Sequence, residues 1–113
     1  MSGLSTHVLD LALGRPAAGV PVLLARREGG GWREMARVET DGDGRVRSLL
    51  PAGEPLAAGD YRLTFLLAEW FAGQGREAFY PEAVVTFTVL RPNEHHHVPL
   101  LLSPFGYSTY RGS

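Results

Sequence analysis

The sequence predicts an all-β fold, an antiparallel sandwich or barrel of eight strands with one short helix after the fifth strand. Short runs of β-branched, aromatic and leucine residues recur along the whole chain. Gly, Pro and Asp residues interrupt these runs at intervals typical of strands joined by turns. The 113 residues suffice for one domain, and no repeat, linker or low-complexity segment divides them. We therefore expect residues 1–113 to form a single domain.

The first half of the chain contains four predicted strands, over residues 5–11, 20–26, 32–40 and 45–50. Clusters of Gly, Pro or Asp end each of the first three, as expected where the chain turns. The strongest of these signals is Asp41-Gly42-Asp43-Gly44, which predicts a tight turn between the third and fourth strands.

The second half of the chain predicts the helix and four more strands. The fifth strand covers residues 61–67, and the pattern over residues 68–74 then suits a short helix that Gly73 and Gly75 end. The remaining strands are expected over residues 83–90, 95–103 and 106–111.

Composition limits the kinds of function. The chain has no Cys, which rules out a thiolate nucleophile, a thiolate metal site and a disulfide framework. Its net charge is −1 and it has no basic run that would follow a phosphate backbone, so we expect no nucleic-acid partner. We see neither a signal peptide nor an apolar stretch near the roughly 20 residues of a membrane-spanning helix. We expect a cytoplasmic protein with no membrane partner.

Three consecutive histidines begin the predicted strand over residues 95–103. Successive side chains of a strand point to opposite faces, so His95 and His97 share one face while His96 lies on the core face. Two imidazoles on one face suit acid–base catalysis or metal binding. The alternatives are a solvated histidine cluster and a zinc site that His7 would complete.

Two further residues and the chain end carry weaker signals. His7 lies within the first strand, where a hydrogen-bonded structural histidine is the alternative to a catalytic one. Arg45 directly follows the tight turn, where the alternative is a solvated turn residue. The last seven residues keep a strand-like pattern with two tyrosines and an arginine, although termini normally fray. This pattern suggests that the chain end packs against the rest of the protein.

Four stretches of the sequence coincide with one known family. They are Ser5-Thr6-His7-Val8-Leu9-Asp10, Asp43-Gly44-Arg45, the run from His95 to Pro104, and Gly106-Tyr107-Ser108-Thr109-Tyr110-Arg111-Gly112-Ser113. Together they resemble the 5-hydroxyisourate hydrolases, which are related to transthyretin, and the resemblance extends over essentially the whole chain. The terminal Tyr-Arg-Gly-Ser is its most specific motif, because transthyretin lacks this ending and the histidines. One departure is His96, where the family commonly has Tyr.

The resemblance implies a fold, an assembly and a reaction. The fold is a transthyretin-like sandwich of two sheets, eight strands and one short helix after the fifth strand. The assembly is a homotetramer, a dimer of dimers with active sites at the dimer–dimer interface. The reaction opens a ring amide of 5-hydroxyisourate, the unstable product of urate oxidation, to give 2-oxo-4-hydroxy-4-carboxy-5-ureidoimidazoline on the route to allantoin. Neither a cofactor nor a metal is implied.

The family's functional positions also imply roles for individual residues. The catalytic residues are His7, Arg45, His97 and Ser113, and the substrate-binding residues are His95, Tyr110 and Arg111. The two catalytic histidines divide the base and acid roles in an order that the sequence leaves open. The arginine offers a planar fork of donors to a urate-like array of carbonyls and to a developing oxyanion. The last residue offers a hydroxyl and the terminal carboxylate.

Three other functions are compatible with the residues. The first is a transthyretin-like carrier that binds an apolar ligand in an open channel. The second is a zinc-binding module or zinc-dependent hydrolase that uses His7, His95 and His97. The third is a purely structural sandwich whose histidines lie at a subunit contact.

Overall fold

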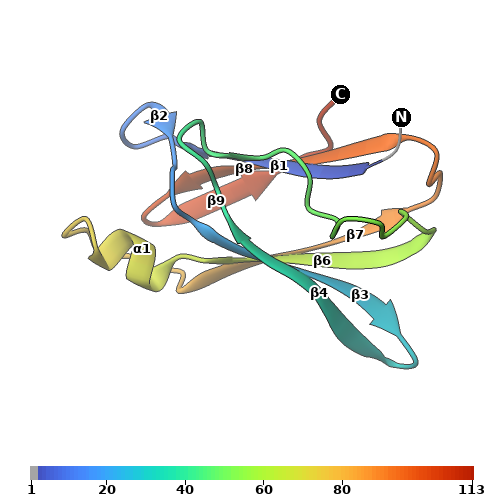
Figure 1. The fold of residues 1–113 in the computed structure, drawn as a ribbon. Helices are drawn as coiled ribbons and strands as arrows, with labels where there is room; N and C mark the ends of the chain where they lie inside the picture. The colour runs from blue at the N-terminus through green and yellow to red at the C-terminus, as the bar shows by residue number, and fades with distance from the viewer. Residues whose placement is uncertain (1–2) are drawn as a thin grey trace.

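The computed structural model describes residues 3–113, which form two β-sheets packed face to face with one short helix at one end (Figure 1). The first sheet contains β1 (Gly3–Asp10), β2 (Arg15–Pro16), β5 (Arg45–Val46), β8 (His95–Ser103) and β9 (Gly106–Thr109). The second sheet contains β3 (Pro21–Glu28), β4 (Gly31–Glu39), β6 (Gly59–Leu66) and β7 (Glu82–Val89), in the order β4-β3-β6-β7. The helix α1 (Ala68–Ala72) follows β6. The predicted all-β sandwich is confirmed. Among residues 3–113, no helix is long and apolar enough to cross a membrane.

Residues 3–113 form nine strands where the sequence predicts eight. The additional strand, β2, has two residues that pair with the end of β1. A two-residue strand has no periodicity from which a sequence pattern could predict it. Two predicted strands are also shorter than expected, because β5 ends at Val46 and β9 ends at Thr109.

The pairing of β1 with β8 is parallel, whereas the sequence predicts antiparallel sheets. Every other strand pair among the described residues is antiparallel. The chain passes through the second sheet between β1 and β8, so it has the length that a parallel connection needs. This pairing places the start of β1 beside the start of β8, with Ser5 opposite His97.

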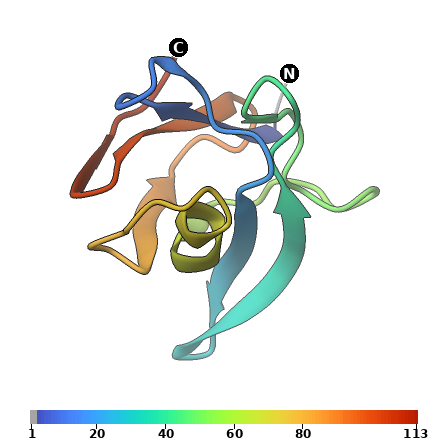
Figure 2. The same cartoon turned by 90° about the vertical axis from the view of Figure 1, so that its left-hand side faces the viewer.

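Alternate side chains of β1 and β8 fill the core between the two sheets. On β8 the residues of one parity, His96, Val98, Leu100 and Leu102, are all buried, which confirms the predicted orientation of this strand. Pro99, of the opposite parity, is buried as well. The four side chains of the first parity pack against apolar side chains of the second sheet such as Leu63. The residues of opposite parity on β1 and β8 therefore lie on the outer face of the first sheet. Figure 2 shows the two layers from the end of the sandwich, with the edge strands β7 and β9 on the same side.

The turn before β5 requires a glycine at position 44. Gly44 has φ +75°, and a Cβ there would lie 2.5 Å from the carbonyl oxygen of Val8. The N–H of Val8 donates to the carbonyl oxygen of Gly44 at 2.7 Å, so the turn lies directly on β1. Asp41 Oδ1 closes the turn by accepting from the N–H groups of Asp43 and Arg45 at 2.9 and 3.0 Å. These contacts fix the point at which Arg45 begins β5.

We expect Gly44→Ala to destabilise the protein by about 2–4 kcal/mol, because the new methyl group combines left-handed backbone strain with a collision against Val8. Urea or thermal unfolding measures the loss. Gly30→Ala is the matched control, since Gly30 has φ +82° but no atom lies within 4 Å of the position that a Cβ would take there. Equal losses in the two variants would show that backbone strain alone, and not the contact with β1, sets the effect.

Candidate active site

Three strands bring polar side chains together on the outer face of the first sheet. β1 lies between β5 and β8, with His7 opposite Arg45 on one side and Ser5 opposite His97 on the other. Side chains two residues apart on a strand share a face, so His95 joins the same group. Residues from opposite halves of the sequence therefore meet at one place because β1 pairs with both strands.

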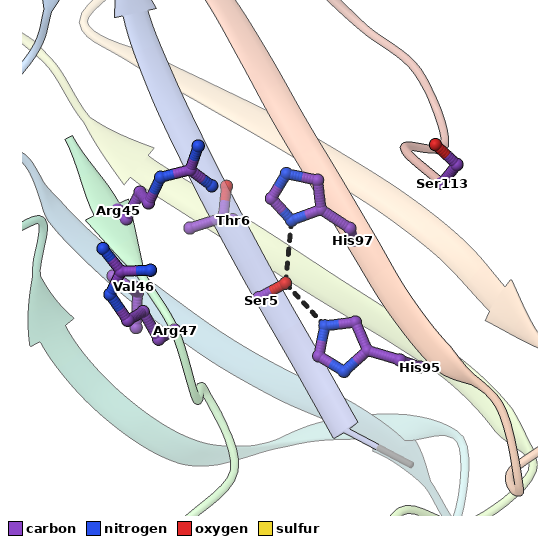
Figure 3. A pocket seen from close by; sticks show the side chains of 8 residues that line it. All are labelled: Ser5, Thr6, Arg45, Val46, Arg47, His95, His97 and Ser113. Atoms are coloured by element: carbon purple, nitrogen blue, oxygen red, sulfur yellow. Dashed lines mark hydrogen bonds between the residues drawn. The ribbon is translucent and has the colours of Figure 1, made fainter. Parts of the chain in front are cut away.

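Ser5 connects the two outer histidines of β8. Its Oγ lies 2.7 Å from Nε2 of His95 and 2.7 Å from Nδ1 of His97 (Figure 3). Ser5 is only 8% exposed, whereas His95 is exposed. The sequence analysis did not assign a role to Ser5, although its parity with His7 on the first strand was a usable signal.

Arg45 and His7 are both held by the tight turn before β5. The backbone N–H of Arg45 is bound by Asp41, which leaves its guanidinium free to reach the site beside His97 (Figure 3). Nε2 of His7 lies 2.9 Å from the carbonyl oxygen of Asp43. A carbonyl oxygen only accepts hydrogen bonds, so Nε2 of His7 carries a proton and donates it. Nδ1 of His7 is then the nitrogen available for other contacts.

The C-terminal segment packs against His97. The N–H of Gly112 donates to the carbonyl oxygen of His97 at 2.8 Å, forming an isolated β-bridge beyond the end of β9. A Cβ at Gly112 would lie 2.5 Å from Cδ2 of the His97 ring, so only glycine lets the chain lie flat on the imidazole. Ser113 follows at the edge of the same cavity. The chain end is therefore packed, as the sequence suggested.

These side chains line a cavity of about 460 Å³ that is mostly polar and open to solvent. Its lining residues are Ser5, Thr6, Arg45, Val46, Arg47, His95, His97 and Ser113 (Figure 3). A volume of this size is in the range of small-molecule sites. The cavity combines imidazoles, a guanidinium and a hydroxyl, which are groups suited to acid–base chemistry on a ring of carbonyls and nitrogens.

His97 is held in its neutral form. Burial lowers the pKa of His97 below its usual 6.5, and the positive charge of Arg45 and the neighbouring His7 and His95 lower it further. Both causes act against the charged imidazolium. At neutral pH, His97 therefore has a free nitrogen that can accept a proton.

We expect the acid limb of kcat/KM to have its midpoint below pH 6.5, because activity is lost only when His97 becomes protonated. Rates measured from pH 5 to 8 would locate this midpoint. Titration of the His97 ring by NMR provides an independent check, and Arg45→Gln should raise the pKa of His97 by removing a nearby positive charge. A flat profile, or a midpoint above 6.5, would contradict the assignment of His97 as the base.

The structure brings four of the seven candidate residues together, since His95, His97, Arg45 and Ser113 line the cavity. His7 is not part of this lining, although it lies opposite Arg45 on the neighbouring strand. Tyr110 and Arg111 lie elsewhere in the structure. They line a second cavity of about 280 Å³ beside the buried His96, between β7 and the chain end.

Arg111 also forms an exposed ion pair with Glu94 at 3.2 Å. The alternation of strand side chains explains the position of Arg111, because its neighbour Gly112 bridges to His97. It does not explain Tyr110, which has the same parity as Gly112; β9 ends at Thr109, and the backbone that follows is irregular. Besides Ser5, the sequence analysis missed Arg47, which lines the cavity and shares strand parity with Arg45. It also missed the packing role of Gly112, for which the motif was the only signal.

Comparison with known proteins shows the family of this chain. The model of the HIUase/Transthyretin family, in which HIUase stands for 5-hydroxyisourate hydrolase, matches residues 4–112. The chain belongs to this family. The 5-hydroxyisourate hydrolase of Caulobacter vibrioides is 50% identical over 117 aligned residues that cover all of both chains.

Two solved structures of the HIUase/Transthyretin family have similar folds but different functions. The Klebsiella pneumoniae 5-hydroxyisourate hydrolase has a TM-score of 0.87 and 42% identity, with all of both chains covered. Sea bream transthyretin, solved in complex with thyroxine, has a TM-score of 0.86 and 33% identity, covering 96% of this chain and 93% of that one. The fold therefore does not separate hydrolases from carriers within the family, and the site residues must do so.

The zinc alternative gains no support from the site. Among residues 3–113, no three His, Cys, Asp or Glu side chains are grouped so that they could hold a metal ion. His7, which would have to complete such a site, instead hydrogen-bonds to a backbone carbonyl at 2.9 Å.

Proposed function

We propose that this protein is a 5-hydroxyisourate hydrolase that opens a ring amide of its substrate to give the carboxylated ureidoimidazoline. The observation that carries the proposal is the placement of a neutral His97 in one cavity with Arg45 and Ser113. The relatives named 5-hydroxyisourate hydrolase that match the full chain support it. A carrier of apolar ligands would gain nothing from a guanidinium and two imidazoles at this place.

In this mechanism His97 is the general base. Its neutral imidazole takes a proton from a water molecule, whose oxygen attacks the ring carbonyl. Arg45 holds the substrate carbonyls through its planar fork of donors and stabilises the developing oxyanion. His7, anchored through Nε2 on Asp43, exchanges a proton with the leaving nitrogen through Nδ1. Ser113 contributes its hydroxyl at the edge of the cavity.

We expect activity to be independent of metal ions, because histidines and an arginine can supply every proton transfer and charge that the reaction requires. Dialysis against a chelator followed by assay, with metal content measured in parallel, tests this expectation. Loss of turnover on chelation and its recovery with zinc would contradict a cofactor-free mechanism.

The proposed assembly is a homotetramer, a dimer of dimers with the sites at the dimer–dimer interface. Two features support it. The edge strands β7 and β9 lie on the same side of the sandwich (Figure 2), and edge strands can pair with those of a second copy. The candidate site also lies on an open outer face, where a second subunit would limit access of water. Light scattering across a range of protein concentrations tests the assembly. Cytoplasmic location is part of the same proposal, and cell fractionation tests it.

Product analysis distinguishes the proposed hydrolase from a transthyretin-like carrier. With ¹³C-labelled urate and urate oxidase, the protein should hasten the appearance of the ring-opened carboxylate in ¹³C NMR spectra. The matched comparison is thyroxine binding, measured by calorimetry. Tight thyroxine binding without faster product formation would favour a transthyretin-like carrier.

A further inference from the structure

The hydrogen bonds of Ser5 make a continuous chain from the partly buried His97 to the exposed His95. A serine hydroxyl has one proton, so it can donate to only one of two imidazole nitrogens and must accept from the other. Both nitrogens lie 2.7 Å from Oγ, which is the distance of a strong hydrogen bond. The chain therefore has a direction, either from His97 to His95 or the reverse.

The role of His97 selects one of these directions. The ring nitrogen Nδ1 of His97 faces Ser5, so Nε2 is the nitrogen left for water. A general base needs a lone pair there, which requires the proton of the neutral ring to lie on Nδ1. In the resting state, Nδ1–H of His97 then donates to Ser5 Oγ, and the Ser5 hydroxyl donates to Nε2 of His95.

We propose that Ser5 and His95 form a proton relay that carries the proton taken up by His97 out to solvent. The proposal rests on the proposed hydrolase function and adds two residues to its proton transfers. His95 is exposed in this chain, whereas His97 is partly buried and Ser5 is only 8% exposed. The relay therefore runs from the partly buried base His97 to the exposed imidazole of His95.

Opening of the ring amide produces a proton that must leave the site. Hydrolysis of a neutral ring amide yields a carboxylic acid, which is ionised at neutral pH because carboxyl groups ordinarily have a pKa of about 4. The leaving nitrogen becomes part of a urea group, which is not basic. Each turnover therefore releases one net proton from a cavity whose base is kept neutral by its surroundings.

Each proton transfer of the relay is balanced by another. Water loses one proton to Nε2 of His97 as its oxygen bonds to the carbonyl carbon. The Nδ1 proton of His97 then passes to Ser5 as the Ser5 hydroxyl proton passes to Nε2 of His95, and His95 releases its Nδ1 proton to solvent. His7 takes the remaining hydroxyl proton of the tetrahedral intermediate at Nδ1 and gives it to the leaving nitrogen as the C–N bond breaks, so the new carboxyl group ends as a carboxylate. After the product leaves, His97 and His95 exchange protons with solvent. This exchange restores the resting state, in which His97 donates to Ser5 and Ser5 donates to His95.

The charges around the relay favour movement toward His95. Arg45 and His7 lie opposite each other, and His7 is in turn opposite Pro99, which is two residues from His97 and four residues from His95 along β8. An imidazolium at His97 would therefore be closer to the guanidinium than one at His95. Arg47, the other cation of the lining, has a side chain that is 68% exposed and pairs with Asp43. The carboxylate of Glu94, the residue preceding His95, is paired with Arg111.

Three variants separate a relay from a purely structural contact. Ser5→Ala removes the connecting hydroxyl. His95→Gln keeps an acceptor for Ser5 but cannot take up and release a proton. The third variant combines both changes. Ser48→Ala serves as the control, because Ser48 is exposed and lies outside the cavity lining.

For both single variants we expect kcat to fall tenfold or more, with KM within about twofold of that of the unchanged protein. The double variant should be no slower than the slower single variant, because both changes break the same chain. Added imidazole buffer should restore kcat in His95→Gln and leave the unchanged protein unaffected. A higher KM with unchanged kcat, multiplying losses in the double variant, or no response to buffer would overturn the relay.

The direction of these hydrogen bonds in the resting protein can be measured without substrate. Long-range ¹H–¹⁵N correlation spectra distinguish the two neutral forms of each imidazole, and we expect His97 to carry its proton on Nδ1. A proton on Nε2 of His97 would overturn the relay even in an active enzyme. If the unchanged protein failed to hydrolyse 5-hydroxyisourate, the hydrolase proposal would fail, whereas full activity in both single variants would refute only the relay.

Discussion

His97→Asn is expected to lower kcat/KM by about 10²–10⁴, the range of a lost general base. His97 is the imidazole whose pKa is lowered by burial and by Arg45, and its Nε2 is the nitrogen that faces away from Ser5. Asparagine can still hydrogen-bond to Ser5 but cannot accept a proton at neutral pH. Steady-state rates on 5-hydroxyisourate, with circular dichroism as the folding control, measure the effect.

His96→Tyr is the matched comparison, because it changes the neighbouring histidine on the opposite face. His96 is 5% exposed and borders the cavity of about 280 Å³ near Tyr110, which gives a larger ring room to extend. The change removes the contact of His96 Nδ1 with the carbonyl oxygen of Glu94, so a small loss of stability is expected. Activity should stay within about twofold of wild type. A larger loss of activity for His96→Tyr than for His97→Asn would contradict the claim that His97, and not His96, acts in the site.

Deletion of Arg111, Gly112 and Ser113 is expected to abolish turnover while the protein stays folded. The N–H of Gly112 binds the carbonyl oxygen of His97, and its backbone covers the His97 ring. Ser113 lines the cavity. The core strands end before this segment, since β9 stops at Thr109. Turnover, the unfolding midpoint and the mass of the assembly should be measured together.

Two smaller changes divide the effect of this deletion into its parts. Gly112→Ala would place a methyl group 2.5 Å from Cδ2 of His97, so the ring must move and kcat should fall at least tenfold. A short tag fused after Ser113 keeps every side chain but extends the chain at the edge of the cavity, and the same tag at the N-terminus is its control. Wild-type turnover in the deletion variant would show that the chain end plays no part in the site.

The sequence pattern predicts local features of the fold better than long-range pairing. The alternation along β8 placed His96 in the core and His95 and His97 outside, and burial in the structure confirms this. The parallel pairing of β1 with β8 could not be predicted in the same way, because strand partners are chosen by packing across the whole domain. This pairing is what places Ser5 between two histidines about ninety positions away.

The C-terminal segment illustrates the same limit at the level of single residues. Its motif indicated that the chain end belongs to the site, and Gly112 and Ser113 do lie against His97 and its cavity. Tyr110 and Arg111 lie beside the second cavity instead. β9 ends at Thr109, so strand parity cannot be extended reliably through the irregular backbone that follows.

The rate at which 5-hydroxyisourate disappears is the most direct test of the hydrolase function. The substrate is generated from urate with excess urate oxidase, and its ultraviolet absorbance is followed with the protein, with His97→Asn and without either. We expect decay in proportion to the amount of protein, with His97→Asn close to the spontaneous rate. Decay at the spontaneous rate in all three reactions would contradict the proposal that this site hydrolyses 5-hydroxyisourate.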